Sequence, residues 1–534
     1  MQVRSTTTAK KKTKSKASAT KPQQTPDLHL EREAAIFRAL DSHQLGYLKR
    51  EQILIALEKA GLHLDDPRLV ETQKRLQELD PPNKIELEKF SGAIAPSVAL
   101  VEQALQGRLV IPDFENFCTE MQEIYDVTKT NTDGTVADYI PQLGRVNPDQ
   151  YGVSLCTIDG QRFSIGESDV RFCVQSSTKP INYCLALETN DTEKVHNHVG
   201  REPSGRGFNE LALNHNGRPH NPMINAGAIM TCSLIKPELN VADRFDYVME
   251  QWAELAGGQK PSFSNSVYLS ERQSADRNFA LGYFMRENKA FPENTELVDI
   301  LEFYFQSCSI EMTADMMSMV AATLANGGIC PSTGKRVFGP ETVQNCLSLM
   351  YSCGMYDFSG EFAFSIGLPA KSGVSGVMMI VVPNVMGLCT WSPRLDRLGN
   401  SVRGIAFCKE LVSRYNFHNY DNLTGISDKK DPRIQTMANE SDLTTMMIWA
   451  ASKGDLTAIQ RLIARGASID TSDYDGRTPL HLAAAEGQCH VVELFIEHGA
   501  ILNPVDRWGG TPLQDAQKGN HKDIAKILKS ASSN

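Results

Sequence analysis

The C-terminal part of the chain repeats itself every 33 residues, and this repeat constrains the fold more than any other feature. Thr478-Pro-Leu recurs as Thr511-Pro-Leu, and Gly466 is matched by Gly499 at the same spacing. Each unit of such a repeat exposes an apolar face that only a neighbouring unit can cover. The sequence therefore predicts a short solenoid of stacked helical units.

The best-defined unit, Gly476-Arg-Thr-Pro-Leu-His-Leu-Ala483, resembles the ankyrin signature. We expect ankyrin repeats over residues 441–534, with Leu443 to Lys453 as an atypical first unit. The polar segment 426–440 is the predicted linker before them. Short arrays bind a partner protein or dock on their own chain, and the pattern leaves both alternatives open.

Length and charge limit the class of protein. A chain of 534 residues is expected to form several domains. The net charge of −10 disfavours nucleic acid as a partner. The longest apolar run, 377–391, is interrupted by Pro383-Asn384 and predicts two strands rather than a membrane span. The 12 cysteines lack metal-binding spacing and are expected to be buried thiols in a reducing compartment.

The first 26 residues carry seven Lys or Arg and no acidic residue. They resemble part of a mitochondrial presequence, although they use Lys rather than Arg and lack an apolar face. A disordered basic tail is the alternative. The tail alone gives little support to a mitochondrial location, and a cytoplasmic protein is the alternative.

Residues 27–114 have helical periodicity around a polar loop, Asp41-Ser-His-Gln-Leu-Gly46, that imitates an EF-hand. Calcium requires oxygen ligands, but His43 and Leu45 stand at positions three and five of this loop and Gln52 at position twelve. We therefore predict a helix-loop-helix packing unit without calcium.

Residues 115–425 combine strand and helix patterns. An alternating segment predicts a hairpin that turns at Asp159-Gly160. Further strands are predicted at 376–382 and 385–391, and a helix at Thr313 to Ala325. This part of the chain should form an antiparallel sheet with a helical layer.

A Ser-x-x-Lys tetrapeptide, Ser176 to Lys179, carries the first chemical signal, and Lys371-Ser-Gly follows later in the chain. Together they are typical of penicillin-recognising serine hydrolases. Ser176 is predicted at a helix N-terminus, where free N–H groups favour an oxyanion, and the i,i+3 spacing puts Lys179 on the same helical face. Taken alone, the tetrapeptide is better explained as an N-cap serine and a solvated lysine.

Further segments, in consistent order over residues 120–420, resemble the serine-dependent glutaminase family. They are Asp138-Tyr-Ile-Pro-Gln-Leu143, His220 to Ile229, Ser270 to Phe279 and Lys371-Ser-Gly-Val-Ser-Gly376. The EF-hand-like and ankyrin flanks resemble those of the animal kidney- and liver-type enzymes, and this resemblance implies a mitochondrial location. The resemblance implies a multidomain protein whose α+β catalytic domain is similar to serine β-lactamases and hydrolyses L-glutamine to L-glutamate and ammonia.

The resemblance also implies roles for individual residues. Ser176 would attack the carboxamide, and its N–H and that of Val374 would form the oxyanion hole. Tyr356 would be the general base or a proton relay, with its phenol perturbed by Lys179. Glu271 would bind the substrate ammonium group. The remaining substrate contacts would come from Tyr139, Asn225, Asn278 and Tyr304.

The chain departs from the kidney-type pattern in the loop 207–213, which includes Phe208 and Leu211. Glu210 stands where those enzymes have a basic residue, and Ala212 where they have an aromatic one. The resemblance puts this loop near the active site and a contact between dimers. We expect no cofactor or metal, inorganic phosphate as activator with an altered response, and a homodimer that pairs into a tetramer.

Two alternatives stand beside the glutaminase hypothesis. One is a β-lactamase or peptidase relative, which would cleave a β-lactam. The other is a catalytically silent ankyrin scaffold, which would have no need to retain Ser176, Lys179 and Tyr356 together.

Overall fold

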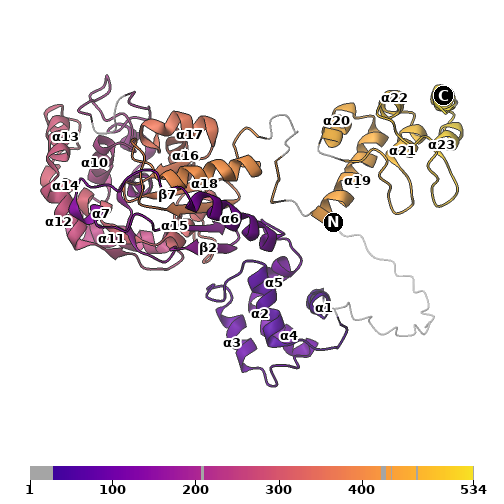
Figure 1. The fold of residues 1–534 in the computed structure, drawn as a ribbon, viewed down its shortest axis with the longest axis horizontal. Helices are drawn as coiled ribbons and strands as arrows, with labels where there is room; N and C mark the ends of the chain where they lie inside the picture. Colours follow the sequence, from indigo (N-terminus) through magenta and orange to yellow (C-terminus); the bar gives the residue numbers. More distant parts are fainter. Residues whose placement is uncertain are drawn as a thin grey trace, which may run out of the picture.

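The computed structural model describes residues 28–41, 43–205, 210–421, 429–433, 436–464 and 467–532. The prediction of a presequence or basic tail at residues 1–26 lies outside the described residues, and so does Phe208. Figure 1 shows three groups of elements: the N-terminal helices α1–α5, a central domain that contains the sheets, and the C-terminal helices α19–α24.

The N-terminal unit is helical, as predicted. Its elements are α1 (Leu28–Leu40), α2 (Arg50–Lys59), α3 (Val70–Glu78), α4 (Leu87–Ile94), the 3-10 turn η1 (Ala95–Ser97) and α5 (Val98–Leu105). They share a core of their own that includes Ile53 and Phe90. In the EF-hand-like loop, the two carboxylate oxygens of Asp41 accept the N–H groups of Leu45 at 2.8 Å and Gly46 at 2.7 Å. Asp41 is the residue that would begin a calcium loop, and both oxygens of its carboxylate are hydrogen-bonded to the loop backbone.

The main sheet of the central domain is antiparallel and has the order β2-β1-β8-β7-β6. Its strands are β1 (Gly152–Thr157), β2 (Arg162–Gly166), β6 (Ala370–Ser372), β7 (Val377–Val382) and β8 (Met386–Trp391). The hairpin predicted at Asp159-Gly160 is confirmed, and Gly160 has a φ of 93° that favours glycine. The strands predicted on either side of Pro383-Asn384 are confirmed as β7 and β8.

Helices cover the sheet and complete the domain. The predicted helix at Thr313 to Ala325 is confirmed as α15 (Ala314–Ala325), with Thr313 as its N-cap. It packs so closely on β8 that a Cβ atom at Gly387 would lie 2.0 Å from the backbone nitrogen of Ala322. Two more helices, α6 (Phe114–Lys129) and α18 (Val402–Arg414), contribute to a second core with the sheet.

The remaining elements form a mostly helical layer around the site. Three short strands, β3 (Phe172–Cys173), β4 (Ser262–Phe263) and β5 (Ile310–Met312), pair in the order β3-β5-β4. The helices are α7 (Pro141–Gly144), η2 (Gln175–Ser177), α8 (Thr178–Thr189), α9 (Thr192–His196), α10 (Asn225–Leu234), α11 (Val241–Leu255), α12 (Asn265–Gln273), α13 (Asp276–Glu287), α14 (Leu297–Cys308), α16 (Pro340–Cys353), η3 (Tyr356–Phe358) and α17 (Ser359–Ser365).

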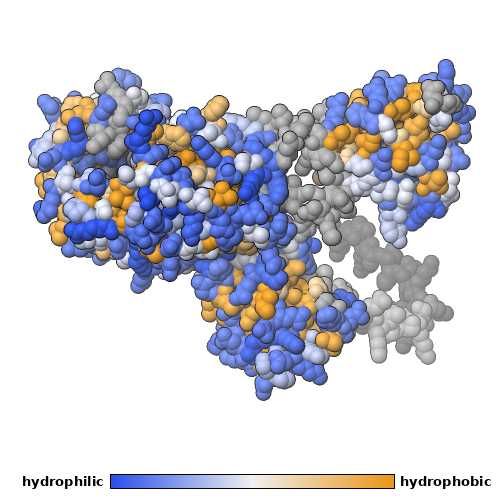
Figure 2. Space-filling view, in the orientation of Figure 1, coloured by the Kyte–Doolittle hydropathy of each residue, from blue (hydrophilic) through white to orange (hydrophobic). Residues whose placement is uncertain are grey.

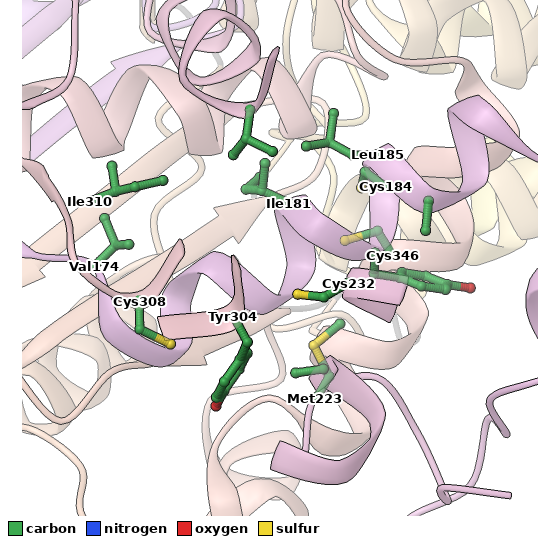
Figure 3. Close-up of a cluster of buried hydrophobic side chains, with 14 of the residues drawn as sticks. Val174, Ile181, Cys184, Leu185, Met223, Cys232, Tyr304, Cys308, Ile310 and Cys346 are labelled. Carbon is green, nitrogen blue, oxygen red and sulfur yellow. The ribbon is translucent and has the colours of Figure 1, made fainter. Parts of the chain in front are cut away.

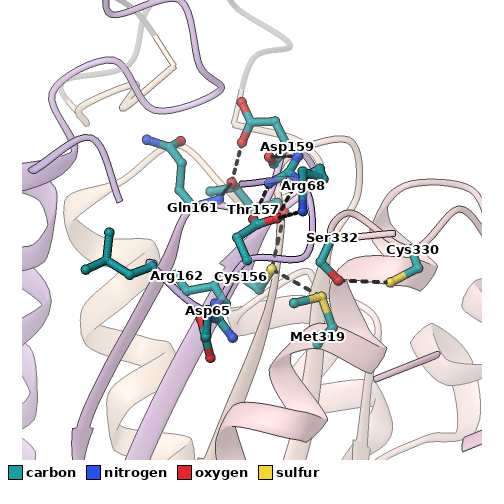
Figure 4. Close-up of polar contacts among 12 residues, drawn as sticks. Asp65, Arg68, Cys156, Thr157, Asp159, Gln161, Arg162, Met319, Cys330 and Ser332 are labelled. Carbon is teal, nitrogen blue, oxygen red and sulfur yellow. Dashed lines mark hydrogen bonds and ion pairs between the residues drawn. The ribbon is translucent and has the colours of Figure 1, made fainter. Parts of the chain in front are cut away.

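The N-terminal unit is bonded to the tip of the β1–β2 hairpin (Figure 4). Gln161 is 1% exposed, and its amide nitrogen donates to the carbonyls of Ala60 and Ile111, both at 2.9 Å. Its amide oxygen accepts the N–H of Ile111 at 3.0 Å. Arg68 donates to the carbonyl of Asp159, and Arg162 pairs with Asp65. These contacts, of which those of Gln161 are buried, fix the helical unit against the sheet.

The C-terminal helices form the stacked repeat that the 33-residue period predicts. They are α19 (Thr436–Lys453), α20 (Leu456–Ala464), α21 (Pro479–Ala485), α22 (Cys489–Glu497), α23 (Pro512–Lys518) and α24 (Lys522–Ala531). Thr478 and Thr511, the repeated threonines, each form a capping box. Helix α19 begins at Thr436, so the last residues of the predicted linker 426–440 belong to this helix.

The surface has mixed polarity (Figure 2). Apolar residues gather over the ankyrin helices in this view, and Trp449, Ile501 and Trp508 of this unit are each more than half exposed. None of the helices in the described ranges is long and apolar enough to cross a membrane. Ten of the twelve cysteines are buried, in agreement with the prediction that they pack as small apolar side chains.

Candidate active site

Ser176 lies where the chain changes from strand to helix. It follows β3 in the 3-10 turn η2, which continues directly into α8. Its neighbour Gln175 has a φ of 48°, a left-handed conformation that non-glycine residues seldom adopt. Such strain is common at functional sites, because the surrounding structure must hold it in place. The predicted setting of Ser176 at the start of a helix is confirmed.

Lys179 contacts Ser176 directly. Its Nζ atom lies 3.0 Å from the Oγ of Ser176 and 2.6 Å from the side-chain oxygen of Asn225. Lys179 is 0% exposed, and burial lowers its pKa to about 8. The alternative of a solvated lysine is therefore wrong. A buried amine with a pKa near neutrality is equipped to exchange a proton with the serine hydroxyl.

A large apolar core holds the helices that carry these groups. Figure 3 shows Ile181, Cys184 and Leu185 of α8 beside Cys232 of α10 and Cys346 of α16. Tyr304 and Cys308 of α14 join the same cluster. Close packing of this kind limits side-chain movement and fixes the relative positions of α8, α10 and α14.

Glu271 provides the carboxylate of the site. It lies on α12 and is 8% exposed, and the hydroxyl of Tyr139 donates to its Oε1 atom at 2.5 Å. Burial raises the pKa of Glu271, and the hydrogen bond from Tyr139 opposes this shift. A cation that binds here would stabilise the ionised carboxylate, because the pocket supplies little solvent.

Three further predicted residues are brought together by hydrogen bonds. Asn225, the first residue of α10, donates from Nδ2 to the side-chain oxygen of Asn278 at 3.2 Å. The Tyr304 hydroxyl donates to the side-chain oxygen of Asn225 at 3.3 Å. Asn225 therefore links Lys179 to Asn278 and Tyr304, so that residues from α8, α10, α13 and α14 form one network.

Tyr356 closes the site from the side of α16, and its φ of 53° is again left-handed. Burial raises its pKa well above the ordinary value, and a hydrogen bond with Ser176 opposes this shift only in part. Lys179 is not among the causes of this shift, and the expectation that Lys179 perturbs the phenol stays a prediction. Desolvation is the largest cause of the raised pKa, and it favours a neutral phenol next to the serine.

Two residues were missed as site residues. Lys371 is fully buried; its Nζ lies 4.5 Å from the centre of the Tyr356 ring and donates to the carbonyl of Ser372 at 2.7 Å. Burial lowers its pKa well below the ordinary value. The Lys371-Ser-Gly segment was the sequence signal that could have identified Lys371 as a site residue. Gln175, which accepts from Tyr139 at 3.2 Å, gave no sequence signal.

Val374 lies in a turn next to the serine segment. The turn is closed by hydrogen bonds from Gly376 to the carbonyl of Gly373 and from Gly373 to that of Val377, both at 2.9 Å. The Ser177 hydroxyl donates to the carbonyl of Lys371 at 3.3 Å, which ties this part of the chain to η2. The turn and the start of α8 are thus held side by side, as an oxyanion hole built from both requires.

A cavity of about 600 Å³ opens beside Tyr356. Glu210 lines it together with Met223 and Cys353. Leu211 is 44% exposed next to it, and the N–H of Ala212 donates to the carbonyl of Glu210 at 3.0 Å. The described part of the loop 207–213 therefore borders the same space as a central residue of the site.

Comparisons with known proteins agree with this geometry. The glutaminase family model matches residues 134–420, an EF-hand domain model matches 10–112, and a model of three ankyrin repeats matches 447–534. The chain is 48% identical to the mitochondrial liver isoform of glutaminase from Rattus norvegicus over 431 residues, 80% of this chain and 72% of the relative. It is also 48% identical to putative glutaminase 2 of Caenorhabditis elegans over 446 residues, 81% of this chain and 74% of that protein.

Solved structures of similar fold cover the central domain. The probable glutaminase ybaS aligns with a TM-score of 0.53 and 36% identity, over 55% of this chain and 96% of its own. A probable glutaminase from Bacillus subtilis, complexed with 6-diazo-5-oxo-L-norleucine, aligns with a TM-score of 0.52 and 29% identity, over 57% and 97% of the two chains. The chain therefore belongs to the glutaminase family and hydrolyses L-glutamine to L-glutamate and ammonia.

Proposed function

We propose that Ser176 is the nucleophile of this hydrolysis and that neutral Lys179 is its general base. The observation that carries the proposal is the 3.0 Å contact between the two side chains, combined with a lysine pKa of about 8. Near neutral pH a useful fraction of such an amine is unprotonated, so it can accept the proton of the serine hydroxyl. An ordinary lysine would be almost fully protonated under the same conditions.

The serine oxygen then bonds to the side-chain carboxamide carbon of glutamine. The carbonyl oxygen becomes an oxyanion, which the N–H groups of Ser176 and Val374 stabilise. Each donor of this kind contributes about 2.7–4 kcal/mol to the transition state. When the C–N bond breaks, the nitrogen takes a proton and leaves as ammonia, and a γ-glutamyl ester remains on Ser176. Water attacks this ester by the reverse sequence and releases glutamate.

Tyr356 acts as a proton relay in its neutral form. Ser176 lowers the pKa of its phenol only in part, and burial keeps the pKa raised, so that the O–H stays intact. It gives this proton to the departing nitrogen and recovers one from the Lys179 ammonium group, so that no phenolate accumulates. This assignment differs from that of a general base, which would require a lowered pKa.

Specificity for glutamine follows from the charges of the pocket. Glu271 binds the substrate ammonium group, and Tyr139 keeps the carboxylate oriented through their 2.5 Å hydrogen bond. The network of Asn225, Asn278 and Tyr304 supplies amide and hydroxyl donors for the α-carboxylate. A β-lactam has no ammonium group at the corresponding position, so the site favours the amino acid over the β-lactamase alternative.

The loop residue Glu210 is proposed to alter the response to inorganic phosphate, the expected activator. It lines the cavity beside Tyr356, where a carboxylate lowers the local concentration of anions. The loss of an aromatic anchor at Ala212 is likewise proposed to weaken inhibitors that bind at a tetramer contact. Phe208, which belongs to the same loop, lies outside the described residues.

Assembly and location are proposed from the relatives. We propose a homodimer that pairs into a tetramer, and a mitochondrial protein, because the relatives from Rattus norvegicus and Mus musculus are named as mitochondrial. The ankyrin unit is proposed to bind a partner protein through its exposed apolar side chains, which include Trp449 and Trp508.

The residue assignment is tested by ammonia and glutamate release from L-glutamine, with and without phosphate. We expect release by the wild-type chain and none by Ser176→Ala. Undiminished release by the variant would overturn the choice of nucleophile. In parallel, 6-diazo-5-oxo-L-norleucine should label the peptide that contains Ser176 in the wild type, as detected by mass spectrometry. Hydrolysis of nitrocefin at a comparable rate would favour the β-lactamase alternative, and a folded chain without glutaminase activity would favour the scaffold.

A further inference from the structure

A second cavity, of about 270 Å³, lies beside the turn that carries Val374. Residues of α7, β3 and the beginning of α12 line it, together with Trp391 at the end of β8. Among the residues assigned to the active site, Val374 alone is part of this lining within the described chain. The cavity is therefore adjacent to the catalytic site and distinct from it.

Two buried polar atoms of this cavity lack a hydrogen-bond partner within the described part of the chain. They are the hydroxyl oxygen of Ser375 and the amide oxygen of Gln142. Ser375 is only 8% exposed. A buried polar atom without a partner is unfavourable, and native proteins usually satisfy it with a protein group, a water molecule or a ligand. The hydroxyl of Ser375 and the amide oxygen of Gln142 could therefore form hydrogen bonds with a polar group of a bound molecule.

The lining of the cavity also carries positive charge. Arg145 and Arg171 both line it and are exposed, whereas Glu311 is the one carboxylate of the described lining. Ser262 donates to Glu311 and accepts from Arg171, both at 2.9 Å, so that part of the negative charge is already engaged. Helix α12 also begins beside the cavity, where Ser264 and Ser266 contribute hydroxyl groups. The charges and the helix terminus both favour an anion.

Apolar side chains make up another part of the lining. Phe172 stacks on Trp391 with ring centres 5.3 Å apart, and Leu143 and Val267 also line the cavity. The volume is slightly below the roughly 300–1,000 Å³ of typical small-molecule pockets. The occupant must therefore be small, with an apolar body between an anionic end and a hydroxyl or amide end.

We propose that this cavity binds a small carboxylic acid with a single-ring or short branched body. Its carboxylate contacts the arginine rim, its body lies against Trp391 and Val267, and its polar end pairs with Ser375 and Gln142. Recognition of this kind depends on the shape and charge of the cavity and not on the catalytic roles of Ser176 and Lys179. It can therefore be measured as binding, separately from glutamine hydrolysis.

The test uses the full chain and 4-hydroxyphenylacetate as the probe. We expect saturable binding in calorimetry, with a change in tryptophan fluorescence because Trp391 lines the cavity. Saturating L-glutamate should leave the affinity unchanged. Ser266→Phe, which narrows the mouth, and Arg171→Gln, which removes a rim charge, should each weaken binding at least tenfold. Ser413→Phe, an exposed serine on α18, is the matched control and should bind like the wild type.

Several outcomes would overturn the proposal. The first is the absence of saturable binding. The second is displacement of the probe by L-glutamate, which would locate the probe in the active site. The third is displacement by inorganic phosphate, which would indicate a site for anions in general. Full affinity in Arg171→Gln would also overturn the proposal. This variant changes only an exposed side chain, so we expect it to fold normally. Equal affinity for 4-methylphenylacetate would contradict the pairing with Ser375 and Gln142.

Discussion

The Nζ atom of Lys179 lies 3.0 Å from the hydroxyl oxygen of Ser176, in a position without solvent exposure. Burial rather than a neighbouring cation prepares this pair, because the lysine pKa falls to about 8 through desolvation. The reactive state is the neutral amine, which predominates above that pH.

Activity should therefore rise with pH. We expect kcat/KM for L-glutamine to increase almost tenfold per pH unit below pH 8 and to level off above it, since the fraction of neutral Lys179 follows this course. Ammonia release measured between pH 6.5 and 8.5 checks the profile. A rate that is constant from pH 7 to 8.5 would contradict the assignment of Lys179 as the base.

Tyr356→Phe should lower kcat by about 10²–10⁴-fold with little change in KM, because it removes a proton relay and leaves the ring in place. The ring contact with Lys371 is preserved in this variant. Tyr351→Phe, which loses a hydroxyl bonded to the carbonyl of Ala363, is the matched control and should keep kcat within twofold. A large rise in KM with normal kcat would instead indicate a role in binding.

Glu271→Gln should reduce kcat/KM for L-glutamine by a factor of roughly 10–150, equivalent to the 1.5–3 kcal/mol of a charge-assisted hydrogen bond. The same variant should lose far less activity on glutaric acid monoamide, which lacks the ammonium group. Glu302→Gln on α14, whose carboxylate pairs with Arg272, serves as control. An equal loss on both substrates would show that Glu271 does not recognise the ammonium group.

Gln161→Ala should lower the free energy of unfolding by about 1–3 kcal/mol, because the backbone groups of Ala60 and Ile111 lose their buried partner. Urea denaturation followed by circular dichroism measures this change. Gln122→Ala, at an exposed glutamine on α6, should stay within about 0.5 kcal/mol of the wild type. Equal stability of the two variants would mean that the N-terminal unit does not depend on this contact.

Glu210→Lys should increase the activation by phosphate, since a cation replaces a carboxylate at the cavity beside Tyr356. A phosphate titration of glutaminase activity should show a lower half-saturation concentration for the variant, and the difference should shrink at high ionic strength. Glu361→Lys, on α17, is the control for a change of net charge alone. A wild-type titration that matches a kidney-type enzyme, with no effect of Glu210→Lys, would refute the idea.

Local patterns predicted much of the fold. The turn at Asp159-Gly160 could be recognised because glycine tolerates the φ of 93° found there. The 33-residue period predicted the stacked helices, two of which begin at capping boxes of Thr478 and Thr511. The pKa of Tyr356 could not be predicted, because it depends on burial by residues far away in the sequence. The same holds for Gln175, whose contact with Tyr139 joins segments 36 residues apart.

The contacts of Gln161 have a consequence for the order in which the chain folds during synthesis. The N-terminal helices leave the ribosome first and already possess their own core. The carbonyl of Ala60 finds its partner only after a further 101 residues have been made. Until the β1–β2 hairpin emerges, water must supply the hydrogen bond to this carbonyl. Docking of the two domains is therefore a late, long-range step, and the N-terminal unit is complete only as a part of the enzyme that follows it.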